Sequence, residues 1–178
     1  MLCIIQARMS SQRLPGKVIM KIGKKEILSH IIDTLKKIKQ ISEIKVATST
    51  SKLDIKIIHI CKKKKIEVVR GNLNNVVSRF FKVLKKAESK FFIRINADSP
   101  FIDKNIIKKA IFHAKKSKYD IVTNVFDKTY PKGQSVEIIR SDIFKTYFTK
   151  IKKKEHLEHI TKFFYDNNKL FKIFNYLT

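Results

Sequence analysis

The sequence predicts an α/β fold in which a mostly parallel sheet lies between two layers of helices. Short apolar runs alternate with amphipathic stretches from residue 2 to about residue 124, and this alternation is typical of parallel strands joined by helical crossovers. The run at residues 91–95 (FFIRI) is almost continuously apolar, which indicates a central strand covered on both faces. With 178 residues, 43% of them hydrophobic, the chain can build one sizeable core, so we expect a single domain over residues 1–178.

The first elements can be assigned in chain order. Residues 2–5 form an apolar run and predict the first strand. The stretch 26–39 predicts a helix, because its isoleucines and leucines recur at helical spacing with lysines on the other face. A strand is expected at 43–48 (EIKVAT), and residues 51–54 (SKLD) resemble a capping box that opens the next helix. The lysines at 62–65 suit the C-terminus of that helix.

The later elements follow from the same patterns until the alternation ends after Asn124. A loop containing Pro131 and Gly133 then leads into a region of short elements. The elements predicted in this part of the chain are strands at 66–69, 91–95, 119–123, 136–139 and 171–176, and helices at 75–88, after Asp103, from Ser141 and over 153–166.

The densest chemistry lies in residues 4–18 (IIQARMSSQRLPGKV), between the first strand and the first helix. Arg13 can bind phosphate oxygens in a bidentate fork, and Lys17 adds a mobile positive charge. Gly16 lets the backbone approach a ligand closely, while Pro15 stiffens the turn before it. A basic loop at this position is how an α/β fold builds a phosphate pocket. The loop is neither a Walker loop nor a GxGxxG motif, and a connection that binds no ligand is the alternative.

A second polar segment, residues 96–103 (NADSPFID), directly follows the predicted central strand. A carboxylate at the carboxyl end of such a strand lies where open α/β sheets bind ligands. Asp98 could therefore hold a Mg²⁺ ion that bridges nucleotide phosphates, since Mg²⁺ is usually bound by one or two carboxylates plus substrate oxygens. Asp103 is better explained as the cap of the next helix.

Five segments together resemble a known family. Residues 6–17 (QARMSSQRLPGK) are similar to the signature loop of the cytidylyltransferases that activate acidic sugars, the acylneuraminate and 3-deoxy-manno-octulosonate group, and most similar to the branch called spore-coat polysaccharide biosynthesis protein F. The segments 70–80 (RGNLNNVVSRF), 96–103 (NADSPFID), 129–137 (TYPKGQSVE) and 158–161 (EHIT) also resemble motifs of this family. The resemblance implies a three-layer, Rossmann-like nucleotidyltransferase sheet of the nucleotide-diphospho-sugar transferase type. It also implies transfer of CMP from CTP to an acidic sugar for a surface polysaccharide.

The resemblance implies roles for individual residues. It makes Arg13, Lys17 and Asp98 the catalytic residues, with Asp98 as the ligand of the implied cofactor, Mg²⁺. CTP and the sugar are then the expected partners, bound by two further sets of side chains. The nucleotide-binding set is Ala7, Arg8, Met9, Ser10, Ser11, Arg13, Gly16, Lys17, Ser49, Arg79 and Asn96, and the substrate-side set is Tyr130, Lys132, Glu137 and His159.

The chain departs from the family pattern in several places. Asn75 and Ser135 stand where the family usually has aspartate, and Ala97 replaces a glycine. The family continues past the segment that ends here at Thr178, into a stretch with a DTPEDL-like motif that supplies a second acidic residue for the metal. We therefore expect a nucleotidyltransferase-like domain that lacks this C-terminal segment. A non-catalytic or degenerate relative that binds a nucleotide or a sugar nucleotide remains the alternative.

Composition bears on the other classes of protein. The net charge of +25 favours a nucleic-acid-binding protein as a distant alternative, but 34 of the 40 basic residues are lysines spread over almost every helical stretch. We interpret most of them as a solvated surface, and do not expect nucleic acid as a partner. The chain has no apolar run long enough to cross a membrane and no signal peptide, and Cys3 and Cys61 fit buried positions. A cytoplasmic protein is expected, with a homodimer as one option for its assembly.

Overall fold

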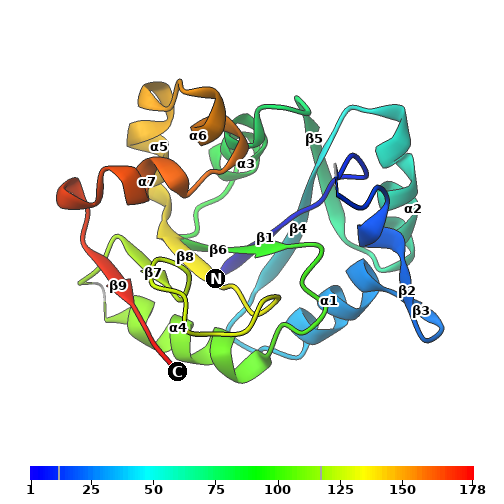
Figure 1. Ribbon diagram of the computed structural model, residues 1–178, viewed down its shortest axis with the longest axis horizontal. Coiled ribbons are helices and arrows are strands. Elements are labelled where there is room, and N and C mark those ends of the chain that lie inside the picture. Colours follow the sequence, from blue (N-terminus) through cyan, green and yellow to red (C-terminus); the bar gives the residue numbers. More distant parts are fainter. Residues whose placement is uncertain (12, 117) are drawn as a thin grey trace.

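The computed structural model describes residues 1–11, 13–116 and 118–178, so Gln12 of the signature loop (residues 6–17) lies outside the described residues. A seven-stranded sheet runs through the molecule in the order β5-β4-β1-β6-β8-β7-β9, with helices on both of its faces (Figure 1). The predicted α/β fold class, with a mostly parallel sheet in three layers, is confirmed.

The parallel half of the sheet is built around its first strand. β1 (Leu2–Gln6) lies between β4 (Glu43–Ser49) and β6 (Phe91–Asn96), parallel to both, and β5 (Glu67–Gly71) extends the sheet beyond β4. The chain winds outward through β4 and β5 and then returns to β6 on the other side of β1. The winding therefore reverses between β1 and β6, and ligands of open α/β sheets bind at the carboxyl ends of the strands at such a point.

The other half of the sheet is mixed. β8 (Glu137–Arg140) is antiparallel to both β6 and β7 (Ile121–Thr123), while the edge strand β9 (Ile173–Asn175) is parallel to β7. A separate two-stranded hairpin, β2 (Lys21–Ile22) and β3 (Lys25–Glu26), follows the signature loop and was not predicted.

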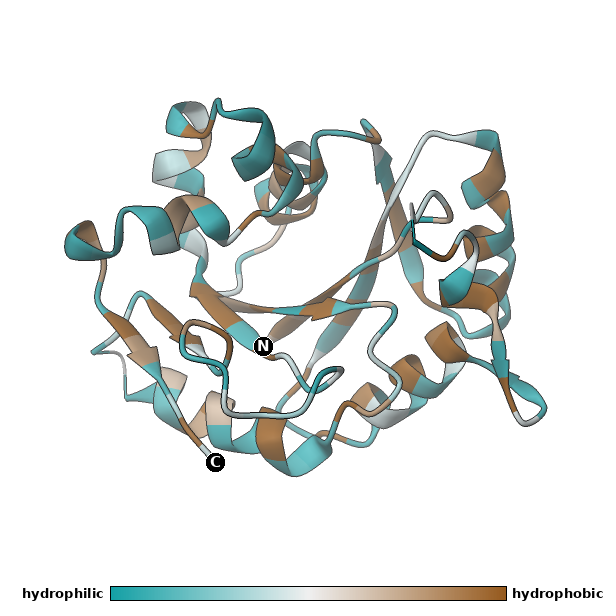
Figure 2. Cartoon of the chain, in the orientation of Figure 1, coloured by the Kyte–Doolittle hydropathy of each residue, from teal (hydrophilic) through white to brown (hydrophobic). Residues whose placement is uncertain are grey.

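The helices divide between the two faces of the sheet, as Figures 1 and 2 show, with their apolar sides turned toward it. One hydrophobic core lies between the sheet and α1 (Ile27–Lys36), α2 (Ile55–Lys63) and α4 (Lys104–Lys115). The second core lies on the opposite face, under α3 (Val76–Lys85), α5 (Ser141–Tyr147), α6 (Lys154–Glu158) and α7 (Lys162–Asp166). Short 3₁₀ turns are η1 (Lys17–Ile19), η2 (Lys52–Asp54), η3 (Phe148–Lys150) and η4 (Asn168–Leu170).

The prediction of one continuous helix over residues 153–166 is wrong. The stretch 153–166 forms two short helices, α6 and α7, because the backbone at His159 (φ −117°, ψ 87°) leaves the helical region. The prediction that Asp103 caps a helix is confirmed. Its carboxylate accepts the backbone N–H groups of Asn105 at 2.6 Å and Ile106 at 3.2 Å.

The two faces of the central strands differ at their carboxyl ends. Toward α1, α2 and α4 the strands stay apolar to their carboxyl ends. On this face β1 ends with Ile5 and is followed by Ala7, and β6 ends with Ile95 and is followed by Ala97. On the opposite face the apolar positions are followed by polar ones, since side chains alternate along a strand. That polar row, at the place where the winding of the sheet reverses, consists of Gln6, Arg94 and Asn96.

Candidate active site

A buried carboxylate fixes the start of the signature loop. Asp54 is 1% exposed, and its Oδ1 accepts the backbone N–H of Met9 at 2.8 Å. Its Oδ2 accepts the Thr48 hydroxyl at 2.9 Å, and the Ser49 backbone N–H and hydroxyl at 3.0 and 2.5 Å. These four hydrogen bonds satisfy the carboxylate and join the loop after β1 to the end of β4.

The capping-box interpretation of residues 51–54 is therefore wrong in one half. Ser51 does cap η2, since its hydroxyl accepts the Leu53 N–H at 3.3 Å. In a capping box the acid would reach back to the cap residue's N–H. Here the Ser51 N–H donates to the Ser49 hydroxyl at 3.1 Å instead, because Asp54 is occupied by the loop.

The loop then closes on itself around Met9. The Met9 carbonyl accepts the backbone N–H groups of Ser11 at 2.9 Å and of Gly16 at 2.8 Å. Gly16 has a φ of +74°, a left-handed conformation that side chains with a Cβ rarely adopt. The result is a compact loop that ends in η1, with Lys17 as the first residue of that turn.

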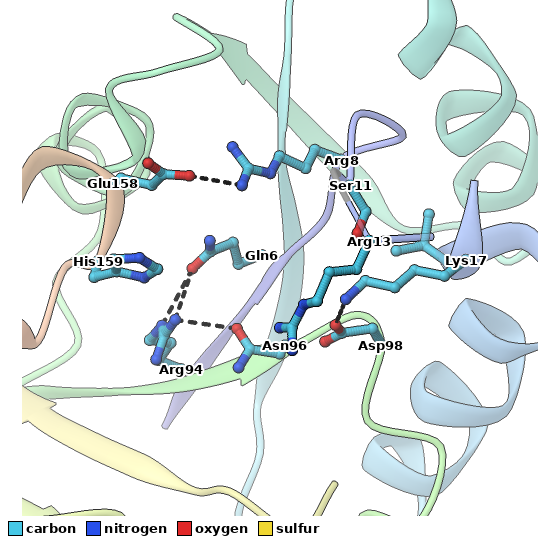
Figure 3. Close-up of a pocket in the computed structure, with 11 residues that line it drawn as sticks. Gln6, Arg8, Ser11, Arg13, Lys17, Arg94, Asn96, Asp98, Glu158 and His159 are labelled. Carbon is cyan, nitrogen blue, oxygen red and sulfur yellow. Dashed lines mark hydrogen bonds and ion pairs between the residues drawn. The ribbon is translucent and has the colours of Figure 1, made fainter. Parts of the chain in front are cut away.

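The first cavity, of about 440 Å³, opens at the carboxyl ends of β1 and β6 (Figure 3). The signature loop and Asp98 form one wall, and α6 with the residue after it forms another. Its floor is the polar row of the two central strands. The lining residues are Gln6, Arg8, Ser11, Arg13, Lys17, Val18, Arg94, Asn96, Asp98, Glu158 and His159.

Basic groups outnumber acidic ones around this cavity. Arg8 donates to Glu158 at 2.8 Å, and this hydrogen bond lowers the pKa of the Glu158 carboxyl. Lys17 forms an ion pair with Asp98 (Figure 3). Arg13 is exposed and forms no ion pair within the part of the chain that the structure describes. An anionic ligand such as a triphosphate therefore meets a surplus of positive charge here.

Two further cavities adjoin the first. The second, of about 340 Å³, shares Asn96 and Asp98 with it and is otherwise lined by Ser99 and by the loop between β7 and β8, including Tyr130, Lys132 and Ser135. The third, of about 390 Å³, shares its Arg8 and Glu158 walls with the first and is completed by Ser10, Leu73, Asn74 and Lys154. The first cavity therefore lies between the other two.

Most of the residues predicted from the sequence line these cavities. Arg8, Ser11, Arg13, Lys17, Asn96, Asp98 and His159 lie around the first, Tyr130 and Lys132 around the second, and Ser10 around the third. A second group shapes the loop from behind instead of lining a cavity, because its members are buried or engaged in backbone contacts: Ala7, Met9, Gly16 and Ser49.

Arg79 lies away from the cavity walls, in the protein interior. It is fully buried, and its Nη1 donates to the carbonyls of Asn72 at 2.7 Å and Leu73 at 3.0 Å. Its Nε and Nη2 have no hydrogen-bond partner among the described residues. Desolvation, together with the nearby Arg8 charge, lowers the pKa of Arg79 to about 10. Its stem packs on Gly71, where a Cβ would lie 2.8 Å from Arg79 Cγ.

Glu137 also lies in the interior, beneath the floor of the first cavity. It is 2% exposed, and its carboxylate forms an ion pair with Arg94 through Oε2 and accepts the Tyr165 hydroxyl at 2.6 Å through Oε1. Burial and the Glu137 charge raise the pKa of the Tyr165 hydroxyl. Glu137 is thus buried because β8 pairs with β6 and places it opposite Arg94.

Sequence reasoning assigned no individual role in this site to four residues, although Gln6 and Glu158 lie in segments that resemble family motifs. Gln6, Arg94 and Glu158 line the first cavity, and Asp54 anchors its loop. A signal for Arg94 was present, because it is the single charge within the apolar run 91–95 and has the same strand face as Asn96. Asn75, which stands where the family usually has aspartate, has a local role, since it caps α3 by accepting the Ser78 N–H at 2.8 Å.

The donor sets available for a metal are limited. Asp98 is the carboxylate that lines both the first and the second cavity. Elsewhere in the described structure Glu155, His156 and Asp166 lie close together, but Lys162 donates to the two Asp166 oxygens at 3.0 and 3.1 Å and already neutralises them.

Among the described residues, no helix is both long and apolar enough to cross a membrane.

Several known proteins are similar to this chain in sequence or in fold. A family model described as cytidylyltransferase matches residues 2–177. An uncharacterised protein of Methanocaldococcus jannaschii is 34% identical over 171 residues, which cover 96% of this chain and 69% of that protein. The spore coat polysaccharide biosynthesis protein SpsF of Bacillus subtilis is 28% identical over 180 residues, which cover 97% of this chain and 72% of that protein.

A shorter match and a solved structure extend the comparison. A 3-deoxy-manno-octulosonate cytidylyltransferase of Thermodesulfovibrio yellowstonii is 28% identical over 120 residues, covering 62% of this chain and 46% of that protein. The structure of a cytidylyltransferase from Leptospira borgpetersenii serovar Hardjo-bovis superposes with a TM-score of 0.93 at 29% identity, covering 99% of this chain and 75% of that chain.

Proposed function

Because the chain belongs to the cytidylyltransferase family, we propose that it transfers CMP from CTP to an acidic sugar and releases pyrophosphate. Two relatives support the kind of acceptor. One is named for spore coat polysaccharide biosynthesis, and another for activation of 3-deoxy-manno-octulosonate, which is an acidic sugar. The product would be a CMP-sugar for a surface polysaccharide. A cytoplasmic location and a homodimer stay predictions.

One observation carries the proposal. Asn96 and Asp98 line both the first and the second cavity, so the two cavities meet at the carboxyl end of β6. A nucleotide in the first cavity and an acceptor in the second would then meet at these two residues. A transfer between two bound substrates needs such a junction, because the reacting atoms must be held close together and in line.

The residues of the junction suggest how the transfer proceeds. A hydroxyl oxygen of the sugar bonds to the α-phosphorus of CTP as the bond from that phosphorus to the bridging oxygen of pyrophosphate breaks, and the hydroxyl proton is lost to solvent. Arg13 and Lys17, on the signature loop, neutralise the triphosphate and the leaving pyrophosphate. The reaction needs no nucleophile from the protein, so positioning and charge are the enzyme's main contribution.

The donor set at the junction fits a Mg²⁺ ion of the kind that nucleotides carry. Asp98 is partly exposed to the cavity, its Oδ2 forms an ion pair with Lys17, and its Oδ1 accepts no hydrogen bond from the described residues. A single carboxylate is enough when substrate phosphates and water complete the shell. When bound, the ion would supply charge neutralisation on the phosphates. Lys17 would then exchange its partner, from Asp98 to a phosphate oxygen.

The second cavity supports an acceptor with a negative charge. Lys128 and Lys132 line it together with Tyr130, and Asp98 is its carboxylate at the junction. An ammonium group offers a mobile point charge that suits a carboxylate. We therefore place the sugar carboxylate toward the two lysines and the reacting hydroxyl toward Asn96 and Asp98.

One observation favours a second candidate, a relative that binds a nucleotide or sugar nucleotide without transfer. Ser135 lines the second cavity where the family usually has aspartate, so this wall lacks a carboxylate that could orient the sugar. Such a protein would bind CTP or a CMP-sugar and release no pyrophosphate. Charge-driven binding of nucleic acid is distinguished by salt, since a phosphate-backbone binder loses affinity steeply and without base preference as salt rises.

The first test is thermal unfolding with CTP, ATP and GTP, each with and without Mg²⁺, on the wild type and on Lys17→Ala and Asp98→Ala. A rise in Tm that is selective for CTP, depends on Mg²⁺ and is lost in both variants is expected, because a bound ligand stabilises the folded state. The matched controls are Lys64→Ala and Asp33→Ala, which break an ion pair outside the cavities. They should keep the CTP response.

Pyrophosphate release then separates the candidates. The proposal expects release with CTP and an acidic sugar, and little with the corresponding neutral sugar. CTP-selective binding without release from any acidic sugar would favour the non-catalytic relative. Equal small shifts with all three triphosphates, unchanged in the variants, would contradict a nucleotide site at this loop.

A further inference from the structure

The floor of the first cavity is organised by one arginine. Arg94 donates from Nε and Nη2 to Gln6 Oε1 at 3.2 and 3.0 Å, and from Nη2 to Asn96 Oδ1 at 3.1 Å (Figure 3). Its Nη1 pairs with Glu137 beneath the floor. The guanidinium therefore holds two amide side chains from one side and is itself held from below.

This arrangement follows from the register of the sheet. Gln6 and Asn96 are direct neighbours across β1 and β6, and Arg94 lies two residues before Asn96 on the same face of β6. Glu137 faces Arg94 across the antiparallel pair of β6 and β8. The four side chains meet because three strands place them there, so their relative positions are as fixed as the sheet.

The chemistry of arginine determines which way both amides point. A guanidinium has five N–H donors and no acceptor, so an amide beside it must present its oxygen. The amino ends of Gln6 and Asn96 then turn away from Arg94. Both residues line the first cavity, and neither amino group donates to an acceptor within the described chain.

Glu137 offsets the electrostatic cost of burying the Arg94 charge. Arg94 has only 11% of its side chain exposed, and a buried charge without a partner would be strongly unfavourable. Glu137 neutralises it and is in turn hydrogen-bonded by Tyr165, whose hydroxyl also contacts Thr123 Oγ1 at 3.0 Å. Because Arg94 and Glu137 neutralise each other, the net positive charge of the cavity lies on its walls. The donors left at its floor are the uncharged amide groups of Gln6 and Asn96.

We propose that Arg94 is a positioning residue that turns the amino groups of Gln6 and Asn96 toward the non-bridging oxygens of the α-phosphoryl group of the nucleotide. The inference rests on the proposed function and adds Gln6 and Arg94 to it. Asn96 lines both cavities, so its amino group lies where the transferred phosphoryl group would pass from CTP to the acceptor. Fixed donors at the site of developing charge stabilise a transition state more than they stabilise the ground state.

The test uses Arg94→Lys in the full chain. Lysine keeps the charge next to Glu137, so the fold is preserved, but one ammonium nitrogen cannot hold both amide oxygens in a planar fork. We expect kcat to fall by about 10²-fold, the cost of losing an oriented donor, while KM for CTP changes by less than about threefold. Arg140→Lys is the matched control, because Arg140 lies on β8, outside the cavities, and pairs with Asp120. It should leave both constants unchanged.

A double-mutant cycle tests whether Arg94 acts through the amides. In a chain that carries Gln6→Leu and Asn96→Leu, the further change Arg94→Lys should lower kcat by less than about threefold, because the groups that it positions are already gone. A full 10²-fold loss in that background would overturn the proposal. So would an unchanged kcat in Arg94→Lys alone, or a loss confined to KM for CTP.

A binding measurement separates this inference from the proposed function. Side-chain amide NMR signals of Gln6 and Asn96, assigned from the two leucine variants, should shift on adding CTP to the wild type and should not shift in Arg94→Lys. Wild-type protein that binds CTP and shows these shifts but releases no pyrophosphate would support the orientation of the amides while contradicting transfer. If the amide signals of Gln6 and Asn96 do not shift when CTP is added to the wild type, the inference is overturned, whatever the enzymatic activity.

Discussion

Asp54 accepts the backbone N–H of Met9 at 2.8 Å, and through this contact a residue that faces no cavity sets the shape of the loop that does. The Met9 carbonyl in turn accepts the backbone N–H groups of Ser11 and Gly16. The loop is therefore held at one residue through both its backbone N–H and its backbone carbonyl. Changes at Asp54 should consequently affect the first cavity as strongly as changes at its walls.

Asp54→Asn should destabilise the protein by about 3 kcal/mol, because an asparagine has one acceptor oxygen and would turn an amino group toward buried donors. Urea unfolding measures this loss, and CTP binding should weaken with it. Asp103→Asn is the matched control, since asparagine caps a helix as well as aspartate does. If both variants lose the same stability, the special role of Asp54 is contradicted.

Gly16→Ala and Gly23→Ala compare two glycines of the same backbone conformation. Gly16 has φ +74° and Gly23 φ +62°, so an alanine should cost about 1–2 kcal/mol at either position. Only Gly16→Ala should weaken CTP binding, because Gly23 lies in the β2–β3 hairpin and its added Cβ would meet no atom within 4 Å. Calorimetric titration with CTP on both variants checks this, and equal affinities would rule out loop geometry as a requirement.

Glu158→Gln should tighten CTP binding by about three- to fivefold, since it removes a negative charge from the cavity and frees Arg8 for the phosphates. The effect should shrink as salt is raised. Glu155→Gln is the control, on the same helix but outside the cavities. Unchanged or weaker binding in Glu158→Gln would mean that Arg8 does not contact the nucleotide.

The same ion pair should give a pH dependence of stability. Arg8 lowers the pKa of the Glu158 carboxyl below its ordinary value of 4.5, so the contribution of the pair is complete above that pH and is lost as the pH falls below it. The difference in stability between wild type and Glu158→Gln should therefore be present at pH 7 and disappear in acid. Chemical unfolding at several pH values measures it, and a difference that grows below pH 4 would have the wrong sign.

Gly71→Ala should destabilise the protein by about 2 kcal/mol, because the new Cβ would lie 2.8 Å from Arg79 Cγ. In an Arg79→Ala background the same substitution should cost much less, with a coupling of about 1–2 kcal/mol between the two sites. Urea unfolding of the four proteins completes the cycle. Additive losses would show that Gly71 is required for some other reason.

The sequence predicted those parts of the molecule that depend on neighbours along the chain. Strand and helix alternation, the Asp103 cap and the basic loop all have local causes, and the structure contains them. The antiparallel insertion of β8 could not be predicted, because the strand is short and its partner is chosen by tertiary packing.

The buried partners of the site lie outside the reach of sequence patterns for the same reason. Asp54 lies 45 residues from Met9, and Glu137 lies 43 residues from Arg94. Each pair forms only when separate strands are aligned. Local reasoning assigned Asp54 to a cap, and the family resemblance placed Glu137 on the substrate side, whereas the fold uses both to support other site residues from within.

The polar row at the ends of β1 and β6 also bears on how accurately the chain assembles. If β6 were to pair one residue out of step, Arg94 would turn into the apolar core under α1 and α4, and Ile93 or Ile95 would face the cavity. A misaligned sheet would then contain a buried cation without its carboxylate, and would be strongly disfavoured. The polar residues at the floor of the cavity thus also favour the correct register between β1 and β6 over a shifted one.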